Sequence, residues 1–139
     1  MSVAEDNRRR FTQMYLDAYR GDFDLTREIL SNDFVCRNPL QPAGGTEDVI
    51  RMLQAQIDAF ENIRFVVQYS FASETGFGIA YEISGRHVKP VFGIPPTGKA
   101  FTVKGVSIHE IADGRSIGVH SSANFIEVLG APSEEARAS

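Results

Sequence analysis

Apolar residues recur with two different periods along the chain, helical in the first half and strand-like in the second. In the opening segment, apolar or aromatic residues fall at i, i+3, i+4, i+7 and i+8, namely Phe11, Met14, Tyr15, Ala18 and Tyr19. This spacing places all five on one face of a helix. A helix with one apolar face buries it against another layer, so the segment is predicted to pack on further structure.

Two more helices are predicted before the period changes. A short one covers residues 25–30, and a longer one follows Gly44-Gly45. Thr46 is the expected N-cap of the longer helix, because its hydroxyl can accept a hydrogen bond from the first turn. The buried stripe of that helix is expected to be Ile50, Leu53, Ile57 and Phe60. Between the two helices, a brief apolar strand at residues 34–36 ends at Asn38-Pro39.

From Ile63 onward the apolar period becomes two, which is typical of strands. Strands are predicted over residues 63–71, with 63, 65, 67, 69 and 71 on one face, and over residues 77–87, 101–111 and 116–123. Helices first and sequential strands afterwards predict an α+β fold, in which a curved, mixed or antiparallel sheet wraps around the N-terminal helices. We expect a single domain over residues 1–139 and a frayed tail at 132–139.

The strand at residues 101–111 is apolar on both faces. Phe101 and Val103 share one face, and Val106 and Ile108 share the other. A sheet with two apolar faces needs a cover on each. The pattern therefore predicts helices against the inner face and a second copy of the chain against the outer face, which is a homodimer.

Composition narrows the class of partner. Hydrophobic residues make up 42% of the 139 residues and the formal net charge is −4, so a nucleic-acid partner is not expected. The sequence shows no long apolar run for a signal peptide or membrane span, and Cys36 is the single cysteine. These features favour a cytoplasmic protein without membrane contact. The three histidines lack metal-ligand spacing, and no nucleotide-binding loop is present, so neither a metal nor a cofactor is expected.

Several local motifs together resemble one family. They are Arg20-Gly21-Asp22, Asn38-Pro39, Gly85-Arg86-His87 and above all the run Gly93-Ile94-Pro95-Pro96-Thr97-Gly98. This arrangement resembles the SnoaL-like polyketide cyclases, within the nuclear-transport-factor-like, ketosteroid-isomerase-like superfamily. The resemblance implies a cone-shaped α+β barrel around an apolar pocket and a small, apolar, polyketide-like substrate. Because related members cyclise, hydroxylate, isomerise or open epoxides, the fold alone narrows the reaction poorly.

The resemblance also implies where an aldol pair of residues should lie. In cyclases that use aldol chemistry, an Asp on the last strand is the general base, and a His on the preceding strand assists. Counting back from Asp113-Gly114 puts Ser107 at the histidine position, and counting back from Leu129-Gly130 puts Asn124 at the aspartate position. An amide has no ionisable form that could accept a proton. We therefore expect a cyclase that acts by positioning and hydrogen bonding, including cycloaddition-type closure.

Two other classes of function stay open. One is a different enzyme on the same fold, a cofactor-independent polyketide hydroxylase or an epoxide-hydrolase-like enzyme. The hydrolase needs a carboxylate that activates water, and inward-facing acids are scarce in this sequence. The other is a ligand-binding module without catalysis, since loss of the aldol pair also fits that class.

His120 and His109 are the candidate acid–base residues, because they share strand parity with Asn124 and Ser107 and imidazole titrates near neutral pH. Each has a structural alternative, as a histidine that only makes hydrogen bonds. Tyr81 could polarise a carbonyl or could be buried with a structural partner. The remaining expected pocket residues are Tyr15, Tyr19, Phe34, Asn38, Met52, Phe60, His87, Phe101, Val103, Ser107 and Ser122. Within that set, His87 could instead orient a turn, and Asn38 could be an Asx-turn residue.

Overall fold

The computed structural model describes residues 2–37 and 44–130. The helices are α1 (Val3–Ala18), α2 (Asp24–Ile29), α3 (Thr46–Ala59) and α4 (Phe125–Leu129). The strands are β1 (Leu30–Arg37), β2 (Phe60–Ala72), β3 (Gly76–His87), β4 (Ala100–Ala112) and β5 (Arg115–Ala123). The predicted α+β class is confirmed. Asn38 and the expected frayed tail lie outside the described residues.

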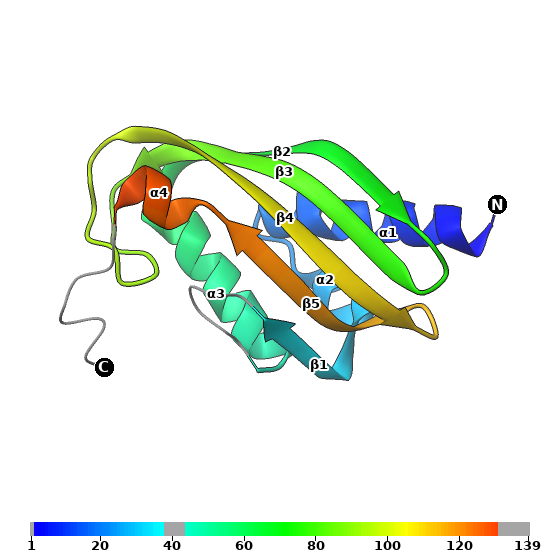
Figure 1. Cartoon of the computed structure of the whole chain (residues 1–139). Coiled ribbons are helices and arrows are strands. Elements are labelled where there is room, and N and C mark those ends of the chain that lie inside the picture. The colour runs from blue at the N-terminus through cyan, green and yellow to red at the C-terminus, as the bar shows by residue number, and fades with distance from the viewer. Residues whose placement is uncertain (1, 38–43, 131–139) are drawn as a thin grey trace.

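The five strands form one curved sheet in the order β1-β5-β4-β3-β2. β1 pairs with β5 in parallel, and the other neighbours are antiparallel, so the sheet is mixed and remains unclosed. In Figure 1 the long strands β2 to β4 cross in front of α1, and α3 lies beside β5. Residues of α1 and α3 line one cavity together with inward-facing residues of β3, β4 and β5, so the helices cover the inner face, as the apolar pattern of the strand at residues 101–111 predicted.

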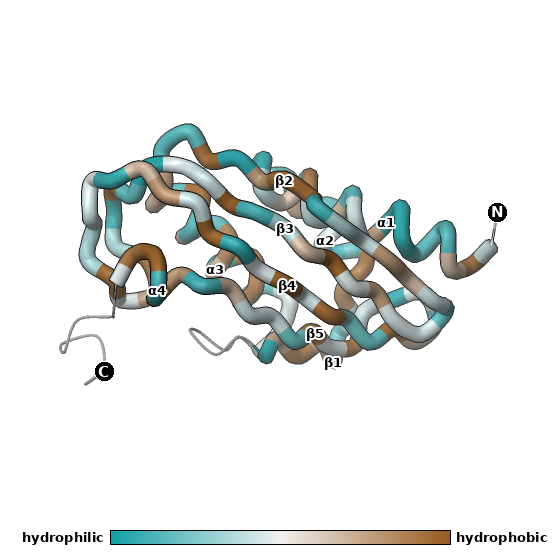
Figure 2. Tube along the Cα trace, turned by 45° about the horizontal axis from the view of Figure 1, so that its top comes forward, coloured by the Kyte–Doolittle hydropathy of each residue, from teal (hydrophilic) through white to brown (hydrophobic). Residues whose placement is uncertain are grey.

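Alternation along β4 separates the two faces of the sheet. Phe101 and Val103 are buried on the inner face, whereas Val106 and Ile108 on the outer face are 49% and 55% exposed. Figure 2 shows hydrophobic and hydrophilic positions alternating along β2, β3 and β4. The predicted parity of this strand is confirmed, and its outer face carries large apolar side chains in contact with solvent.

The expected parity of β2 holds only to Val67. Val67 pairs with Tyr81, but Tyr69 pairs with Ala80, so one extra residue is inserted between these pairs. A bulge of this kind exchanges the two faces of the strand beyond it. Tyr69 and Phe71 therefore lie exposed on the outer face, not on the inner face with Phe65.

The start of α3 differs from its expected cap. Gly45 is the N-cap residue and Thr46 is the first helical residue. The Asp48 carboxylate reaches back and accepts a hydrogen bond from the Gly45 N–H at 3.4 Å. An acidic residue at the third helical position supplies this reciprocal contact, so the helix needs no hydroxyl cap. Among residues 2–37 and 44–130, none of the helices combines the length and the hydrophobicity needed to cross a bilayer.

Candidate active site

A cavity of about 70 Å³ lies between α1 and α3 and the inner face of β3, β4 and β5. Its wall is mainly apolar. The polar side chains that line it are Tyr15, Tyr19, Thr26, Gln56, Tyr81, Ser107, His109 and Ser121. No carboxylate, lysine or arginine is found among the lining residues in the described part of the chain. The cavity therefore offers neutral hydrogen-bonding groups inside an apolar shell.

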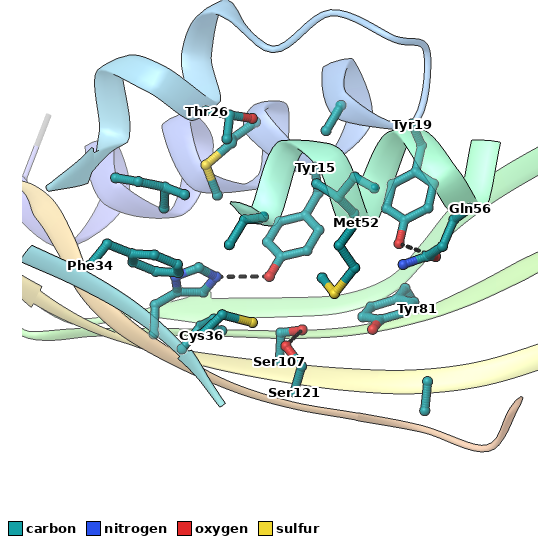
Figure 3. A pocket seen from close by; sticks show the side chains of 18 of the residues that line it. Tyr15, Tyr19, Thr26, Phe34, Cys36, Met52, Gln56, Tyr81, Ser107 and Ser121 are labelled. Carbon is teal, nitrogen blue, oxygen red and sulfur yellow. Dashed lines mark hydrogen bonds between the residues drawn. The ribbon is translucent and has the colours of Figure 1, made fainter. Parts of the chain in front are cut away.

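A chain of hydrogen bonds leads from the cavity into the core. The Tyr15 hydroxyl lies 2.8 Å from His109 Nε2, and His109 Nδ1 lies 2.8 Å from Ser116 Oγ. Ser116 in turn donates to the Gly118 carbonyl at 3.2 Å. Figure 3 shows the Tyr15 hydroxyl at the cavity end of this chain, above Ser107 and Ser121.

The direction of these hydrogen bonds follows from the number of protons available. Because the single hydroxyl proton of Ser116 is donated to Gly118, Ser116 Oγ accepts from His109 Nδ1–H. Burial lowers the pKa of His109 to about 3, so the imidazole is neutral at pH 7 and carries its one proton on Nδ1. Nε2 is therefore the acceptor, and Tyr15 donates to it. The remaining lone pair of the Tyr15 oxygen can accept a hydrogen bond, and the Ser107 hydroxyl, whose contact opposes the rise in the Tyr15 pKa that burial causes, is the neighbouring donor within the protein.

Aromatic packing holds the imidazole in place. The His109 ring lies edge-on to Phe11 at a centroid distance of 5.4 Å, and it stacks on Phe34 at 6.4 Å. Phe77 lies 5.9 Å away on a third side. An imidazole with ring neighbours on several sides has little freedom to rotate, so the Tyr15 hydroxyl meets a fixed partner.

Tyr81 owes its position to a missing side chain on the neighbouring strand. A Cβ atom built on Gly105 would lie 2.7 Å from atoms of the Tyr81 ring, so the ring occupies the space above Gly105. Tyr81 is buried, and burial raises the pKa of its phenol, an effect that contact with Ser107 partly offsets. The phenol is protonated at neutral pH and can donate a hydrogen bond to a ligand.

Two serines face each other across β4 and β5. Ser107 and Ser121 are register partners, and their hydroxyl oxygens lie 2.9 Å apart. One of the two hydroxyls donates to the other, which leaves one proton of the pair for another acceptor. The serine pair and Tyr81 thus supply donors on the sheet side of the cavity.

Comparison with known proteins agrees with this architecture. The sequence profile of the SnoaL-like polyketide cyclases matches residues 9–130. The chain belongs to this family. No protein of curated function matches the sequence at a significant level.

Solved structures resemble this SnoaL-like protein in fold. One, described as a SnoaL-like polyketide cyclase from Jannaschia sp. CCS1, is 18% identical with a TM-score of 0.82, and the match covers 96% of this chain and 97% of that one. IdmH from Streptomyces antibioticus, described as a polyketide cyclase, is 19% identical with a TM-score of 0.72, covering 86% and 93%. AclR from Streptomyces galilaeus, described as a hydroxylase, is 17% identical with a TM-score of 0.73, covering 88% and 91%. At these identities the likeness establishes the fold alone.

The inward position opposite Ser107 in this SnoaL-like protein is Ser121, not Asn124. Asn124 follows the end of β5 and is the N-cap residue of α4. Its amide oxygen accepts a hydrogen bond from the Lys104 N–H at 2.8 Å, which extends the sheet by one residue. The placement of Asn124 in the pocket was therefore wrong, because the count back from Leu129-Gly130 missed the inward position by three residues.

His120 and Ser122 were expected in the pocket because they share strand parity with Asn124. Both lie exposed on the outer face of the sheet. Val119, Ser121 and Ala123 are the β5 residues that line the cavity. Successive strand residues point to opposite faces of the sheet. A shift of three residues in the reference position therefore exchanges the inward and outward side chains along the whole strand. Hence His109 is the histidine that the fold brings to the cavity wall.

Four other expected pocket residues belong to the packed core beyond the cavity wall: Phe60, His87, Phe101 and Val103. Phe60 lies at the junction of α3 and β2, where its ring packs 4.5 Å from Phe101 and 5.7 Å from His87. His87 Nδ1 accepts a hydrogen bond from the Thr97 N–H at 3.3 Å. This matches the turn-orienting alternative for His87.

The structure brings together seven of the predicted residues at the cavity: Tyr15, Tyr19, Phe34, Met52, Tyr81, Ser107 and His109. Sequence reasoning missed Gln56, Ser116 and Ser121. For Ser121 a signal existed, since it shares parity with the apolar residues Val119 and Ala123. Gln56 follows Met52 by four residues, one helical turn, which also places it on the buried side of α3.

Proposed function

We propose that the protein is an enzyme that closes a ring in a polyketide-derived intermediate, by holding the chain in a reactive shape and by hydrogen bonding. The observation that supports this most directly is the neutral lining of the cavity. Among the described lining residues no carboxylate is present to act as an aldol base or to activate water for epoxide opening. What the cavity offers is shape together with several fixed donors and acceptors.

The polar groups suit a chain that carries carbonyl and enol oxygens. Tyr81 and the serine pair Ser107–Ser121 can donate to a carbonyl oxygen and polarise it. The Tyr15 oxygen, whose own proton is engaged by His109, can accept from an enol hydroxyl. Donors and an acceptor around one apolar space orient the two reacting ends of a folded chain.

The neutrality of His109 favours ring closures in which no net charge develops. Transfer of the Tyr15 proton to His109 would place an imidazolium in a site that lowers the pKa of that group to about 3. Such a state is costly in an apolar core. Closures with little charge separation, including cycloadditions, avoid that cost. Holding the reacting carbons in a near-attack geometry lowers the activation free energy of such a closure, by less than the roughly 7–11 kcal/mol available when two separate molecules are brought together, because the two ends already belong to one chain.

The cavity must widen to accept a polyketide-derived chain. Its volume of about 70 Å³ is smaller than the roughly 150 Å³ cavity that holds a benzene ring. Met14 and Met52 both line it. Methionine side chains are unbranched and change conformation readily, so they are the natural elements to move when a substrate enters.

Tyr15→Phe tests this function. With a linear poly-β-ketone generated by a synthase as the probe substrate, the wild type is expected to accelerate formation of the ring-closed product. Loss of the phenol oxygen removes the group that accepts a hydrogen bond from the enol hydroxyl, and we expect the rate to fall roughly 3- to 10-fold, the amount that a single neutral hydrogen bond supplies. Product formation is measured by liquid chromatography and mass spectrometry.

Tyr69→Phe is the matched control, because Tyr69 is 64% exposed on the outer face. Its rate should equal that of the wild type. Equal rates for Tyr15→Phe and Tyr69→Phe would contradict the proposed role of the cavity. Hydroxylated, uncyclised product would indicate a hydroxylase, and binding without any turnover would indicate a ligand-binding module.

We also propose that a second copy of the chain covers the outer face of the sheet. Large apolar side chains are exposed there on β2, β4 and β5, namely Val66, Tyr69, Phe71, Val106, Ile108 and Ile117. Residues of this kind gathered on one sheet face are typical of an interface. A stable dimer buries about 800 Å² on each partner, which is an area that several strands can supply.

Ile108→Glu tests the dimer. The substitution puts a charge at the centre of the proposed interface, so light scattering after gel filtration should report a dimer for the wild type and a monomer for the variant. Val3→Glu is the matched control, because Val3 on α1 is 55% exposed, the same as Ile108. A monomeric wild type, or a dimer that Ile108→Glu leaves intact, would argue against this interface.

A further inference from the structure

A second polar pair lies in the cavity, away from the sheet. The Tyr19 hydroxyl donates to Gln56 Oε1 at 3.1 Å, and both side chains are buried, with exposures of 8% and 3%. Tyr19 comes from the end of α1 and Gln56 from α3. In Figure 3 this pair lies on the far side of Tyr15 and Met52 from Phe34 and Cys36.

Tyr19 determines which end of the Gln56 carboxamide faces the cavity. Burial raises the pKa of Tyr19 well above its ordinary value, so the phenol keeps its proton and donates it to the amide oxygen. The amide nitrogen is then directed elsewhere, and Figure 3 shows it on the side toward Met52 and Tyr81. Two N–H donors are thereby presented among the side chains that line the cavity.

A glutamine at this position is not required for packing. Its neighbours on the buried side of α3 are the apolar residues Val49, Met52 and Ala59. An apolar side chain of similar length would fill the same space but would leave the buried Tyr19 hydroxyl without its acceptor; that contact uses only the amide oxygen of Gln56 and does not involve its two N–H groups. A buried amide is compensated only when its hydrogens meet an acceptor. The side chains that Figure 3 places beside the amide nitrogen are Met52 and Tyr81. A thioether sulfur is a weak acceptor, so a ligand oxygen that enters the cavity is a stronger partner for these N–H groups.

We propose that the Gln56 carboxamide, oriented by Tyr19, is a specificity-determining site that binds a second carbonyl oxygen of the substrate. The inference rests on the proposed function and extends it. The donors on the sheet side, Ser107, Ser121 and Tyr81, hold the reacting carbonyl, and Gln56 holds another oxygen some distance along the same chain. The preferred substrates are therefore chains with at least two separated carbonyl groups.

The test compares ligands that differ by one carbonyl. Decan-2-one and a series of decanediones, in which the second carbonyl moves along the chain, are titrated into the full-length protein and followed by NMR chemical shifts. One dione of suitable spacing is expected to bind the wild type about 3- to 10-fold more tightly than decan-2-one, the amount that a single neutral hydrogen bond supplies. Gln56→Met keeps the length of the side chain and removes the donors, so this preference should disappear.

Gln54→Met is the matched control. Gln54 lies on the same helix but hydrogen-bonds the Asp58 carboxylate at 2.9 Å and is not a cavity residue, so the preference for the dione should persist. Unchanged binding of decan-2-one to Gln56→Met shows that the variant is folded. If Gln56→Met retains the preference, or if the wild type binds decan-2-one and every dione equally, the role of Gln56 is wrong while the proposed function stands. If the wild type binds none of these ligands, both proposals fail.

Discussion

Replacing Phe11 with alanine is expected to lower the free energy of unfolding by about 3–5 kcal/mol. Phe11 is fully buried, and its ring packs 5.2 Å from Phe77 and 5.4 Å from His109. The residue therefore joins α1 to the inner face of the sheet. Its truncation leaves a void that rigid strand side chains cannot fill. Chemical denaturation at a fixed protein concentration measures the loss.

The expected loss of unfolding free energy in Phe11→Ala comes from the burial of the ring and not from a change in helix propensity. Val3→Ala makes a similar truncation at the exposed start of the same helix, and its effect should stay within about 0.5 kcal/mol. A loss below about 1 kcal/mol for Phe11→Ala would mean that α1 does not anchor the sheet as described. The same variant should also weaken ligand binding, because Phe11 supports the imidazole that engages Tyr15.

Acidification is expected to destabilise the protein through His109. The unfolded chain binds a proton at this residue near the ordinary pKa of about 6.5, whereas the folded chain binds it only near the lowered pKa of about 3. Between these values the unfolded state holds more protons, so stability falls as the pH falls. From pH 7 to pH 4 this single group should lower the free energy of unfolding by about 3 kcal/mol.

The contribution of His109 can be separated from that of the carboxylates by a difference measurement. His109→Gln removes the titration and keeps a hydrogen-bonding side chain. Denaturation of both proteins at several pH values should show a loss for the wild type that is larger by about 3 kcal/mol over this interval. Parallel pH profiles for the two proteins would mean that His109 titrates normally and that the assigned tautomer of the buried chain has to be revised.

The fold could be predicted from the sequence wherever burial selects one face of an element. The helical spacing of Phe11, Met14 and Tyr15 and the alternation along β4 depend on this rule alone. β5 was harder, because its residues are mostly small or polar and its inward positions include a serine. A hydrophobic period cannot show which residues of such a strand face inward. The prediction for β5 therefore depended on Asn124 as its reference, and because Asn124 does not face the cavity, the inward and outward residues of the strand were exchanged.

The candidate site was only partly accessible to sequence reasoning, for a related reason. Tyr15 and His109 were both proposed as pocket residues, yet they are 94 positions apart, and nothing in the local spacing indicates that they share a hydrogen bond. Gln56 was missed because a polar residue inside an apolar stripe does not contribute to the hydrophobic period. Partners that meet only through tertiary packing require the three-dimensional structure.

The absence of a side chain at Gly105 affects the size of the cavity, through the position of the Tyr81 ring. Since the Tyr81 ring rests where a methyl group would otherwise project, any larger residue at this position pushes the ring toward the ligand space. Cavity size is thus adjustable from a site that contributes no functional group of its own. Gly105 offers a way to change which substrates fit while every hydrogen-bonding side chain stays the same.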